Sequence, residues 1–163
     1  MTSQAHDSKE EPRRRKQSNL AIRGAMRELG IQLALLNYHV SSRLELKDVD
    51  LDCLNLVDQY GPLSPTAIAR MSGLHPATMT GILDRLEQGG WVARERDPAD
   101  RRAVLVHALR ERMPDLLRLY QGMSASMNKI CAGYTNEELE LVADFLQRTA
   151  SAGQAAADEI AGS

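Results

Sequence analysis

The stretch from Ser64 to His107 constrains the fold more than any other part of this chain of 163 residues. It reads "SPTAIARMSGLHPATMTGILDRLEQGGWVARERDPADRRAVLVH". Two segments with apolar residues at helical spacing meet at Ser72-Gly73, and two short segments rich in apolar and β-branched residues follow Gly89-Gly90. Two helices, a turn and a hairpin with a charged tip are typical of a winged helix-turn-helix. The stretch therefore predicts a unit that binds DNA.

Local signals set the ends of these two helices. Ser64 is expected to cap the first helix, with Pro65 at its first position, where the missing N–H of proline costs nothing. Gly73 supplies the positive φ that a tight turn between helices needs. Ala69 is small enough to let the two helices cross closely. The second helix is expected to open at His75-Pro76 and to bury Met79, Ile82, Leu83 and Leu86.

The opposite face of this second helix suits a major groove. Its small residues permit close approach, Thr78 can donate or accept at a base edge, and Arg85 can reach a phosphate. The residues of this segment that we expect at the DNA are His75, Ala77, Thr78, Gly81 and Arg85. Taken alone, the same pattern also fits an ordinary amphipathic helix with a solvated face.

The hairpin expected after this helix strengthens the prediction. Residues 91–94 and 103–106 are the expected strands. Asp97, with the proline that follows it, starts the turn between them, and Asp100 can fix an adjacent guanidinium. Arg101 or Arg102 is then left to project from the tip, where an arginine can enter a narrow minor groove.

The run "TGILDRLEQGGWV" and the wing "DPADRR" carry a family resemblance. The segment from Gly61 to His107, roughly a third of the chain, resembles the multiple-antibiotic-resistance regulator (MarR) family of bacterial winged-helix transcription factors. The resemblance implies a homodimer on a palindromic DNA operator, with wing arginines in the flanking minor grooves. It also implies repression that a small phenolic or other ligand relieves. Among the residues of this chain it implies DNA contacts for Thr78, Thr80 and Arg85, and a wing anchored by Asp100 with Arg101.

The sequence departs from the family after the wing. Family members usually start the next helix with a Leu-Thr cap, whereas Ala108-Leu109-Arg110 offers no short capping side chain. Pro114 requires that the helix starts close to it or is kinked there. We therefore expect the hinge between the wing and the following helices to differ from the family's usual one.

Two heptad patterns flank the winged unit. In each, apolar residues step alternately by four and three: Ile22, Met26, Leu29, Leu33, Leu36 and Val40 in the first, and Leu116, Tyr120, Met123, Met127, Ile130 and Tyr134 in the second. A head of roughly ninety residues cannot cover both patterns, so we favour packing between two subunits. Core stripes of a single bundle are the alternative.

These signals predict a mainly α chain with a small β-hairpin wing. The expected parts are a disordered basic tail (1–18), an N-terminal dimerisation helix (19–45), the winged helix-turn-helix (46–108), C-terminal dimerisation helices (109–150) and a fraying tail (151–163). The basic tail carries Arg13, Arg14, Arg15 and Lys16, which either reach DNA phosphates or only solvate the tail.

Composition excludes several classes of protein. No apolar run is long enough for a membrane span, and the polar N-terminus is unlike a signal peptide. The spacing of Cys53 and Cys131 predicts neither a disulfide framework nor a metal site, which fits a reducing cytoplasm. No catalytic motif occurs, and the four histidines His6, His39, His75 and His107 do not space as metal ligands. We expect no enzyme activity, cofactor or metal.

Two other functions stay open. The formal net charge is −2, so there is no general basic field. Within the winged unit Arg70, Arg85, Arg94, Arg96, Arg101 and Arg102 are nearly offset by Asp84, Glu87, Glu95, Asp97 and Asp100. The unit could therefore be a protein–protein module without DNA binding, and a regulator that senses oxidants through a thiol is a further alternative. For a small aromatic or anionic effector, the candidate contacts are Tyr38, His39 and Arg43.

Overall fold

The computed structural model describes residues 4–98, 100 and 102–162, with side-chain environments from residue 11 onward. It contains six helices and one antiparallel hairpin among these residues. In chain order they are α1 (Gln4–Arg43), α2 (Asp48–Tyr60), α3 (Pro65–Ser72), α4 (Pro76–Gln88), β1 (Val92–Arg96), β2 (Val104–Ala108), α5 (Met113–Cys131) and α6 (Asn136–Ala161). The prediction of a mainly α chain with a small hairpin is confirmed.

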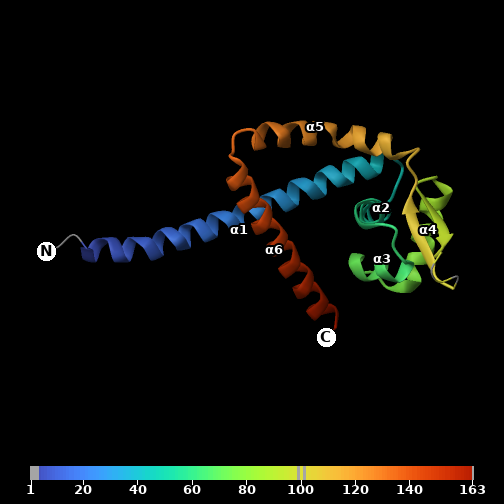
Figure 1. Cartoon of the computed structure of the whole chain (residues 1–163), viewed down its shortest axis with the longest axis horizontal. Coiled ribbons are helices and arrows are strands. Elements are labelled where there is room, and N and C mark those ends of the chain that lie inside the picture. The colour runs from blue at the N-terminus through green and yellow to red at the C-terminus, as the bar shows by residue number, and fades with distance from the viewer. Residues whose placement is uncertain (1–3, 99, 101, 163) are drawn as a thin grey trace.

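The chain consists of a compact head and three long helices (Figure 1). The head, residues 46–108, holds α2, α3, α4 and the hairpin. Helix α1 runs out of the head as a long rod, α5 runs back beside it, and α6 turns across α1 (Figure 1). No helix among the described residues is both long and apolar enough to cross a membrane.

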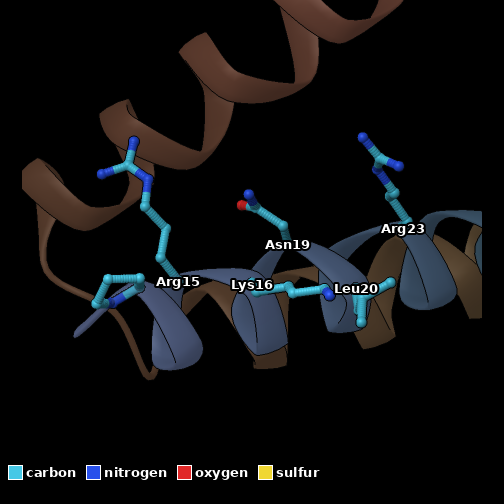
Figure 2. A pocket seen from close by; sticks show the side chains of 6 residues that line it. Arg15, Lys16, Asn19, Leu20 and Arg23 are labelled. Carbon is cyan, nitrogen blue, oxygen red and sulfur yellow. The ribbon is translucent and has the colours of Figure 1, made fainter. Parts of the chain in front are cut away.

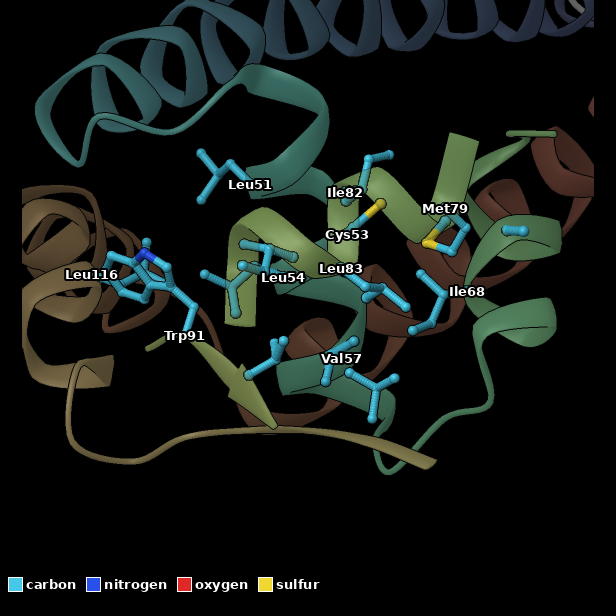
Figure 3. Close-up of a cluster of buried hydrophobic side chains, with 14 of the residues drawn as sticks. Leu51, Cys53, Leu54, Val57, Ile68, Met79, Ile82, Leu83, Trp91 and Leu116 are labelled. Carbon is cyan, nitrogen blue, oxygen red and sulfur yellow. The ribbon is translucent and has the colours of Figure 1, made fainter. Parts of the chain in front are cut away.

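The core lies almost entirely inside the head. Leu51, Leu54 and Val57 on α2 are at most 2% exposed, so this helix is surrounded by its neighbours. Figure 3 shows side chains from α3, α4, β1 and the start of α5 converging on α2. The predicted apolar stripe of α4, namely Met79, Ile82, Leu83 and Leu86, is buried as expected. Burial of this kind stabilises a fold by about 25 cal/mol per Å² of apolar surface.

The turn between α3 and α4 forms as the sequence predicts. The Ser64 hydroxyl accepts a hydrogen bond from the Ala67 N–H at 3.2 Å and caps α3. Gly73 ends α3 with a φ of 66°, the left-handed conformation that glycine adopts without strain. The Leu74 N–H then donates to the Ala69 carbonyl at 2.9 Å and closes the turn.

An aspartate at the start of a helix often caps it, but the aspartate at the start of α2 has another role. Helix α2 begins at Asp48, but its N-cap is Lys47, with no side-chain cap. The Asp48 carboxylate accepts a hydrogen bond from the Ser41 hydroxyl instead. Asp48 therefore ties α2 to the end of α1.

The hairpin is shifted by one to two residues from the expected strands. Trp91 is buried and precedes β1, and the ladder runs from Val92 opposite Ala108 to Arg96 opposite Val104. The strand after the tip also pairs with the segment before α3, since Leu63 and Val106 exchange both backbone hydrogen bonds at 3.0 and 2.8 Å. This pairing fixes the base of the hairpin to the head.

Helix α5 starts where Pro114 requires. It begins at Met113, places Pro114 in its first turn, and has no side-chain cap at Arg112. The Thr135 capping box that opens α6 is complete, because the Glu138 N–H donates to the Thr135 hydroxyl and the Thr135 N–H donates to the Glu138 carboxylate.

Both chain ends are more helical than predicted. Residues 4–18, expected to be disordered, belong to α1, and residues 151–161, expected to fray, belong to α6. Alanine, glutamate, glutamine, lysine and arginine have high helix propensity and extend a helix without tertiary contacts. In α6 the Gln154 side chain also donates to Asp158 one turn later, at 2.8 Å.

The two heptad patterns are buried only at the head. Val40 on α1 and Leu116 on α5 are 3% and 2% exposed. The Tyr120 hydroxyl donates to Asn37 at 2.8 Å and bridges these two helices. Further from the head the same patterns lie open: Ile22, Leu29, Leu33, Met127, Ile130 and Tyr134 are 39–56% exposed. Packing within this chain therefore buries only the end of each heptad pattern that lies next to the head.

Candidate nucleic-acid interface

Helix α4 presents the predicted contact face to solvent. His75 caps the helix through its ring Nδ1, which accepts a hydrogen bond from the Ala77 N–H at 3.2 Å. Ala77, Thr78 and Thr80 are exposed, and Gly81 is half-buried on the same helix. Small and hydroxyl-bearing side chains beside an exposed helix N-terminus let the helix approach a base edge or a phosphate closely.

Arg85 is placed differently from the rest of the predicted set. Its Nε–H donates to Asp50 Oδ2 at 2.8 Å and its terminal N–H to Asp50 Oδ1 at 2.6 Å, a bidentate pair. The Asp50 side chain is 2% exposed, while that of Arg85 is 40% exposed. The hydrogen bond to Asp50 raises the pKa of Arg85 above its ordinary value. Arg85 therefore holds α4 on α2, with only its remaining edge open to solvent.

Asp50 is a functional residue that the sequence analysis missed. It lies on the buried stripe of α2 with Cys53, Leu54 and Val57, at positions i, i+3, i+4 and i+7. A carboxylate at an apolar position of such a stripe signals a buried partner, because an unpaired buried charge is costly. That signal was present in the sequence, although it does not say which cation is the partner.

A second ion-pair cluster joins the wing to α4. The Arg94 guanidinium on β1 donates to Asp84 at 2.6 Å and lies 3.3 Å from the Glu87 carboxylate. The other Glu87 oxygen accepts the Arg94 backbone N–H at 3.3 Å. Arg94 therefore fixes the orientation of the wing relative to the contact face of α4.

The wing tip is closed by hydrogen bonds to the backbone. The Asp100 carboxylate accepts the Arg102 N–H at 2.9 Å, and the Ala103 N–H donates to the Asp100 carbonyl at 2.9 Å. The Asp97 N–H donates to the Ala103 carbonyl at 3.0 Å. Arg102 is exposed, whereas Arg101 lies outside the described residues.

A third arginine connects the head to α5. The Arg112 guanidinium lies 4.0 Å from the centre of the Trp91 ring, and one of its N–H groups donates to the Gly89 carbonyl at 2.6 Å. Gly89 is the C-cap of α4. Arg112 therefore couples the end of α4 to the start of α5, at the N-cap position where α5 has no side-chain cap.

The groove between α3, α4 and the hairpin has a volume of about 350 Å³. Pro65, Met79, Thr80 and Arg94 are among the residues that line it. It opens beside α4, so it is continuous with the surface that carries Thr80.

The predicted effector residues lie apart from this surface. Tyr38, His39 and Arg43 are exposed near the C-terminal end of α1. The Tyr38 and His39 rings meet edge to face, with centres 5.5 Å apart. The structure brings the two rings together but leaves them open to solvent.

Cys53 has the environment of an inert core thiol. It is 0% exposed, and burial, the main cause, raises its pKa to about 11. Oxidant sensing needs an accessible thiolate, so the structure argues against Cys53 as a sensor. The described residues also include no group of three His, Cys, Asp or Glu that could hold a metal ion.

Comparison with known proteins now decides the family. The sequence model of the MarR family matches residues 46–104, which is the head up to the start of β2. The uncharacterized HTH-type transcriptional regulator YcgE of Bacillus subtilis (strain 168) is 34% identical over 124 residues, covering 76% of this chain and 80% of that protein. The chain belongs to the MarR family.

Other relatives agree with this assignment. The HTH-type transcriptional repressor YetL of Bacillus subtilis (strain 168) is 30% identical over 52% of this chain and 50% of its own length. Among solved structures, a MarR family protein from Bacillus stearothermophilus has a TM-score of 0.62 at 16% identity, covering 83% of this chain and 95% of that one. The transcriptional regulator Tm0710 from Thermotoga maritima has a TM-score of 0.60 at 22% identity, covering 82% and 94%. These structures share the fold of the MarR-family chain.

Membership sets the general activity of the MarR-family chain. It is a transcriptional regulator that binds DNA through a winged helix. The α4 face and the wing tip are the parts of the head whose chemistry suits that activity.

Proposed function

We propose that this MarR-family chain is a homodimeric repressor that binds a palindromic operator with one α4 helix in each half-site. The observation that carries the proposal is the solvent-facing set Ala77, Thr78, Thr80 and Gly81 on a helix whose position is held by the Asp50–Arg85 pair. A rigid helix with small polar residues on its free face supports direct readout in a major groove.

The wing supplies the second contact in this proposal. Arg102 is exposed at the tip, with its backbone fixed by Asp100, and the proposal places Arg101 or Arg102 in the minor groove beside each half-site. Arg85 acts mainly as a positioning residue, and only its open edge is available to a phosphate. Asp97 and Asp100 keep the turn in shape.

Exposed apolar side chains support the dimer. Nearly all of the exposed large apolar residues lie on α1, α5 and α6, and they include Leu29, Leu33, Ile130, Leu141 and Phe145. A surface of this kind marks an interface between proteins. A second copy that covers it pairs two heads, which explains why a palindrome is expected.

Repression is proposed because a relative of this chain, YetL, is named a repressor. Release by a small aromatic or anionic effector at Tyr38, His39 and Arg43 stays a prediction. A function on chromosomal DNA places the chain in the cytoplasm.

Selection from a pool of random-sequence duplexes tests the proposal. We expect enrichment of two inverted half-sites whose centres are about one helical turn, roughly 34–36 Å, apart. Thr78→Ala should then cost about 1–3 kcal/mol on the selected site and relax sequence preference within the half-site. Arg101→Ala and Arg102→Ala, measured separately, identify which arginine enters the minor groove, since only that variant loses affinity.

The same protein and duplexes can distinguish DNA binding from the alternative of a protein–protein module. One observation favours that alternative: Arg85 and Arg94 form ion pairs inside the head, so they are less available to DNA phosphates. DNA binding through phosphates must weaken steeply as salt is raised. If the wild-type chain does not bind any duplex at low salt, the proposed function is wrong.

A further inference from the structure

The N-terminal half of α1 carries a basic face that the function of the head does not use. We define the arm as residues 11–27 of α1. At about 100° per residue, Arg15, Lys16, Asn19, Arg23 and Arg27 fall within one third of the helix circumference. Figure 2 shows the Arg15, Asn19 and Arg23 side chains rising from the same side of α1.

This face contains a shallow groove. The groove has a volume of about 410 Å³ and is lined by Pro12, Arg15, Lys16, Asn19, Leu20 and Arg23. Among the residues whose side chains the structure describes, no carboxylate pairs with these cations. Of the acidic residues nearest in sequence, Glu28 lies off the face by its helical phase and accepts a hydrogen bond from Gln32, whereas Glu11 stands one turn before Arg15 without forming an ion pair with it. The arm therefore presents several cations for which the side chains described in the structure supply no ion-pair partner.

The acidic helix α6 does not supply that counter-charge well. Glu138 accepts the Thr135 N–H, Asp144 lies 3.5 Å from Arg148, and Asp158 accepts from Gln154. These carboxylates already have partners within their own helix. Exposed ion pairs between single side chains also contribute little to stability. A polyanion with closely spaced charges is a better match for a continuous row of cations.

Two arginines of the head, in contrast, are engaged inside the chain. Arg85 is bound to Asp50 and Arg94 to Asp84 and Glu87, and just after the head Arg112 is bound to the Gly89 carbonyl and the Trp91 ring. Double-stranded DNA carries one negative charge per about 1.7 Å of its axis, and neutralising phosphates supplies much of the affinity of DNA-binding proteins. A DNA-binding chain with a nearly balanced head needs cations from another element.

We propose that the basic face of the arm, built from Arg15, Lys16, Asn19, Arg23 and Arg27, is a second DNA-binding surface that contacts the phosphate backbone outside the base pairs read by the chain's own α4. The inference rests on the proposed function, because the partner is the DNA that the head binds. The arm residues lie about 24–42 Å along α1 from its head end at Arg43, at about 1.5 Å per residue. The arm thus extends the footprint by at most about 12 base pairs at 3.4 Å each.

The contact has no sequence preference. The face offers guanidinium, ammonium and amide donors, which bind phosphate oxygens, and the helix lies on the backbone rather than on base edges. The arm is therefore expected to raise the affinity for all duplexes and to leave the selected operator sequence unchanged.

The test uses full-length protein and a mixed-sequence duplex. The triple variant Arg15→Gln/Lys16→Gln/Arg23→Gln removes three charges and keeps the helix, because glutamine is a good helix former. The probe is fluorescence anisotropy at several salt concentrations. Each phosphate contact contributes about 0.9 to the slope of log Kobs against log salt. In a homodimer with both arms on the DNA the triple variant removes six charges, so its slope should be shallower by about 5.4, together with weaker binding at low salt.

Arg14→Gln is the matched control. By helical phase Arg14 lies opposite the basic face of the arm, so this variant should keep the wild-type slope, whereas Arg23→Gln alone, which removes one charge from each chain of the dimer, should reduce the slope by about 1.8. Circular dichroism checks that the helix is retained in each variant.

Three outcomes would overturn the proposal while leaving the proposed function intact. The first is an unchanged slope in the triple variant when the wild-type protein binds. The second is an equal reduction with Arg14→Gln, because the effect then reflects net charge rather than a face. The third is dissociation of the dimer in the triple variant, seen by sedimentation, because the arm then binds a second copy. Failure of the wild-type protein to bind DNA contradicts the proposed function itself and is thereby distinguished.

Discussion

The ion pair between Asp50 and Arg85 holds the recognition helix against the core of the head. The pair is asymmetric, since the Asp50 side chain is 2% exposed and the Arg85 side chain is 40% exposed. Removing Arg85 should therefore lower the free energy of unfolding by a different amount from removing Asp50. An aspartate left alone is buried without compensation, whereas an arginine left alone can turn into water.

Arg85→Met should lower the free energy of unfolding by about 2–4 kcal/mol, which allows for the partial exposure of the pair. Asp50→Asn should cost about 1 kcal/mol, because the amide oxygen still accepts a hydrogen bond. Urea denaturation measures both variants. The double variant should recover part of the loss of Arg85→Met, since no buried charge remains. Equal costs for the two single variants would contradict the assigned asymmetry.

The two cysteines provide a second prediction about single side chains. Because Cys53 is fully buried and its pKa is about 11, only about one thiol in a thousand is ionised at pH 8. Cys131 is half-buried on α5. In the native protein, a disulfide reagent such as DTNB should react first with Cys131 and much more slowly with Cys53.

Cys131→Ser should remove the fast phase of this reaction, and urea should make Cys53 react at once. A fast reaction of Cys53 in the folded Cys131→Ser variant would revive the redox-sensing alternative. Cys53→Ser should leave the response of DNA binding to peroxide unchanged.

Among the elements, the junction between α4 and α5 is one of the contacts that join the head to the long helices. It is formed by Arg112, which stacks on Trp91 and donates to the C-cap carbonyl of α4. A family-type cap is absent here, and Arg112 supplies a contact in its place. Arg112 therefore helps to set the orientation of the head relative to α5, together with Leu116, which α5 buries in the core of the head.

Arg112→Ala should destabilise the protein by about 1–2 kcal/mol through loss of a cation–π contact and a charged hydrogen bond. Arg110→Ala is the control, because Arg110 is exposed on the same connection. Thermal unfolding gives the stability, and amide hydrogen exchange should show faster opening at the C-terminal end of α4. If Arg110→Ala has the same effect, the contact with Trp91 and Gly89 is not the cause.

At the scale of the molecule, two apolar surfaces are uncovered among the residues that the structure describes. One is on the outer part of α1, and the other is on α5 and α6, where Ile130 and Phe145 are 56% and 40% exposed. A dimer in which a second copy covers these surfaces is stabilised, because their apolar area is removed from water.

Phe145→Glu and Ile130→Glu should each raise the dimer dissociation constant by on the order of 100-fold, because a buried unpaired charge costs several kcal/mol. Gln147→Glu is the matched control, since Gln147 is exposed and polar on the same helix. Sedimentation velocity measures the fraction of dimer over a concentration series. A molecular mass that stays that of a dimer in both variants would place the interface elsewhere.

The head could be predicted from the sequence because the signals that build it are local. Caps, turns and apolar stripes act over one to four residues, so Ser64, Gly73 and the buried stripe of α4 lie where their spacing predicts. Helix ends at 4–18 and 151–161 were misjudged, because polar composition suggested disorder where helix propensity prevails. The helical period of 3.6 residues is also enough to predict which residues of α4 face the solvent.

Long-range packing was needed to assign the arginines. Arg85 was predicted at a phosphate, yet it is bound to Asp50, 35 residues earlier in the chain. Arg94 and Arg112 likewise have partners that spacing does not reveal. Charge and reach are properties of a residue type, but the partner of a charged side chain depends on which elements the fold brings within a few ångströms. The sequence alone therefore predicts the winged helix. The tertiary structure was needed to show which arginines form ion pairs inside the head and which face the solvent where DNA can bind.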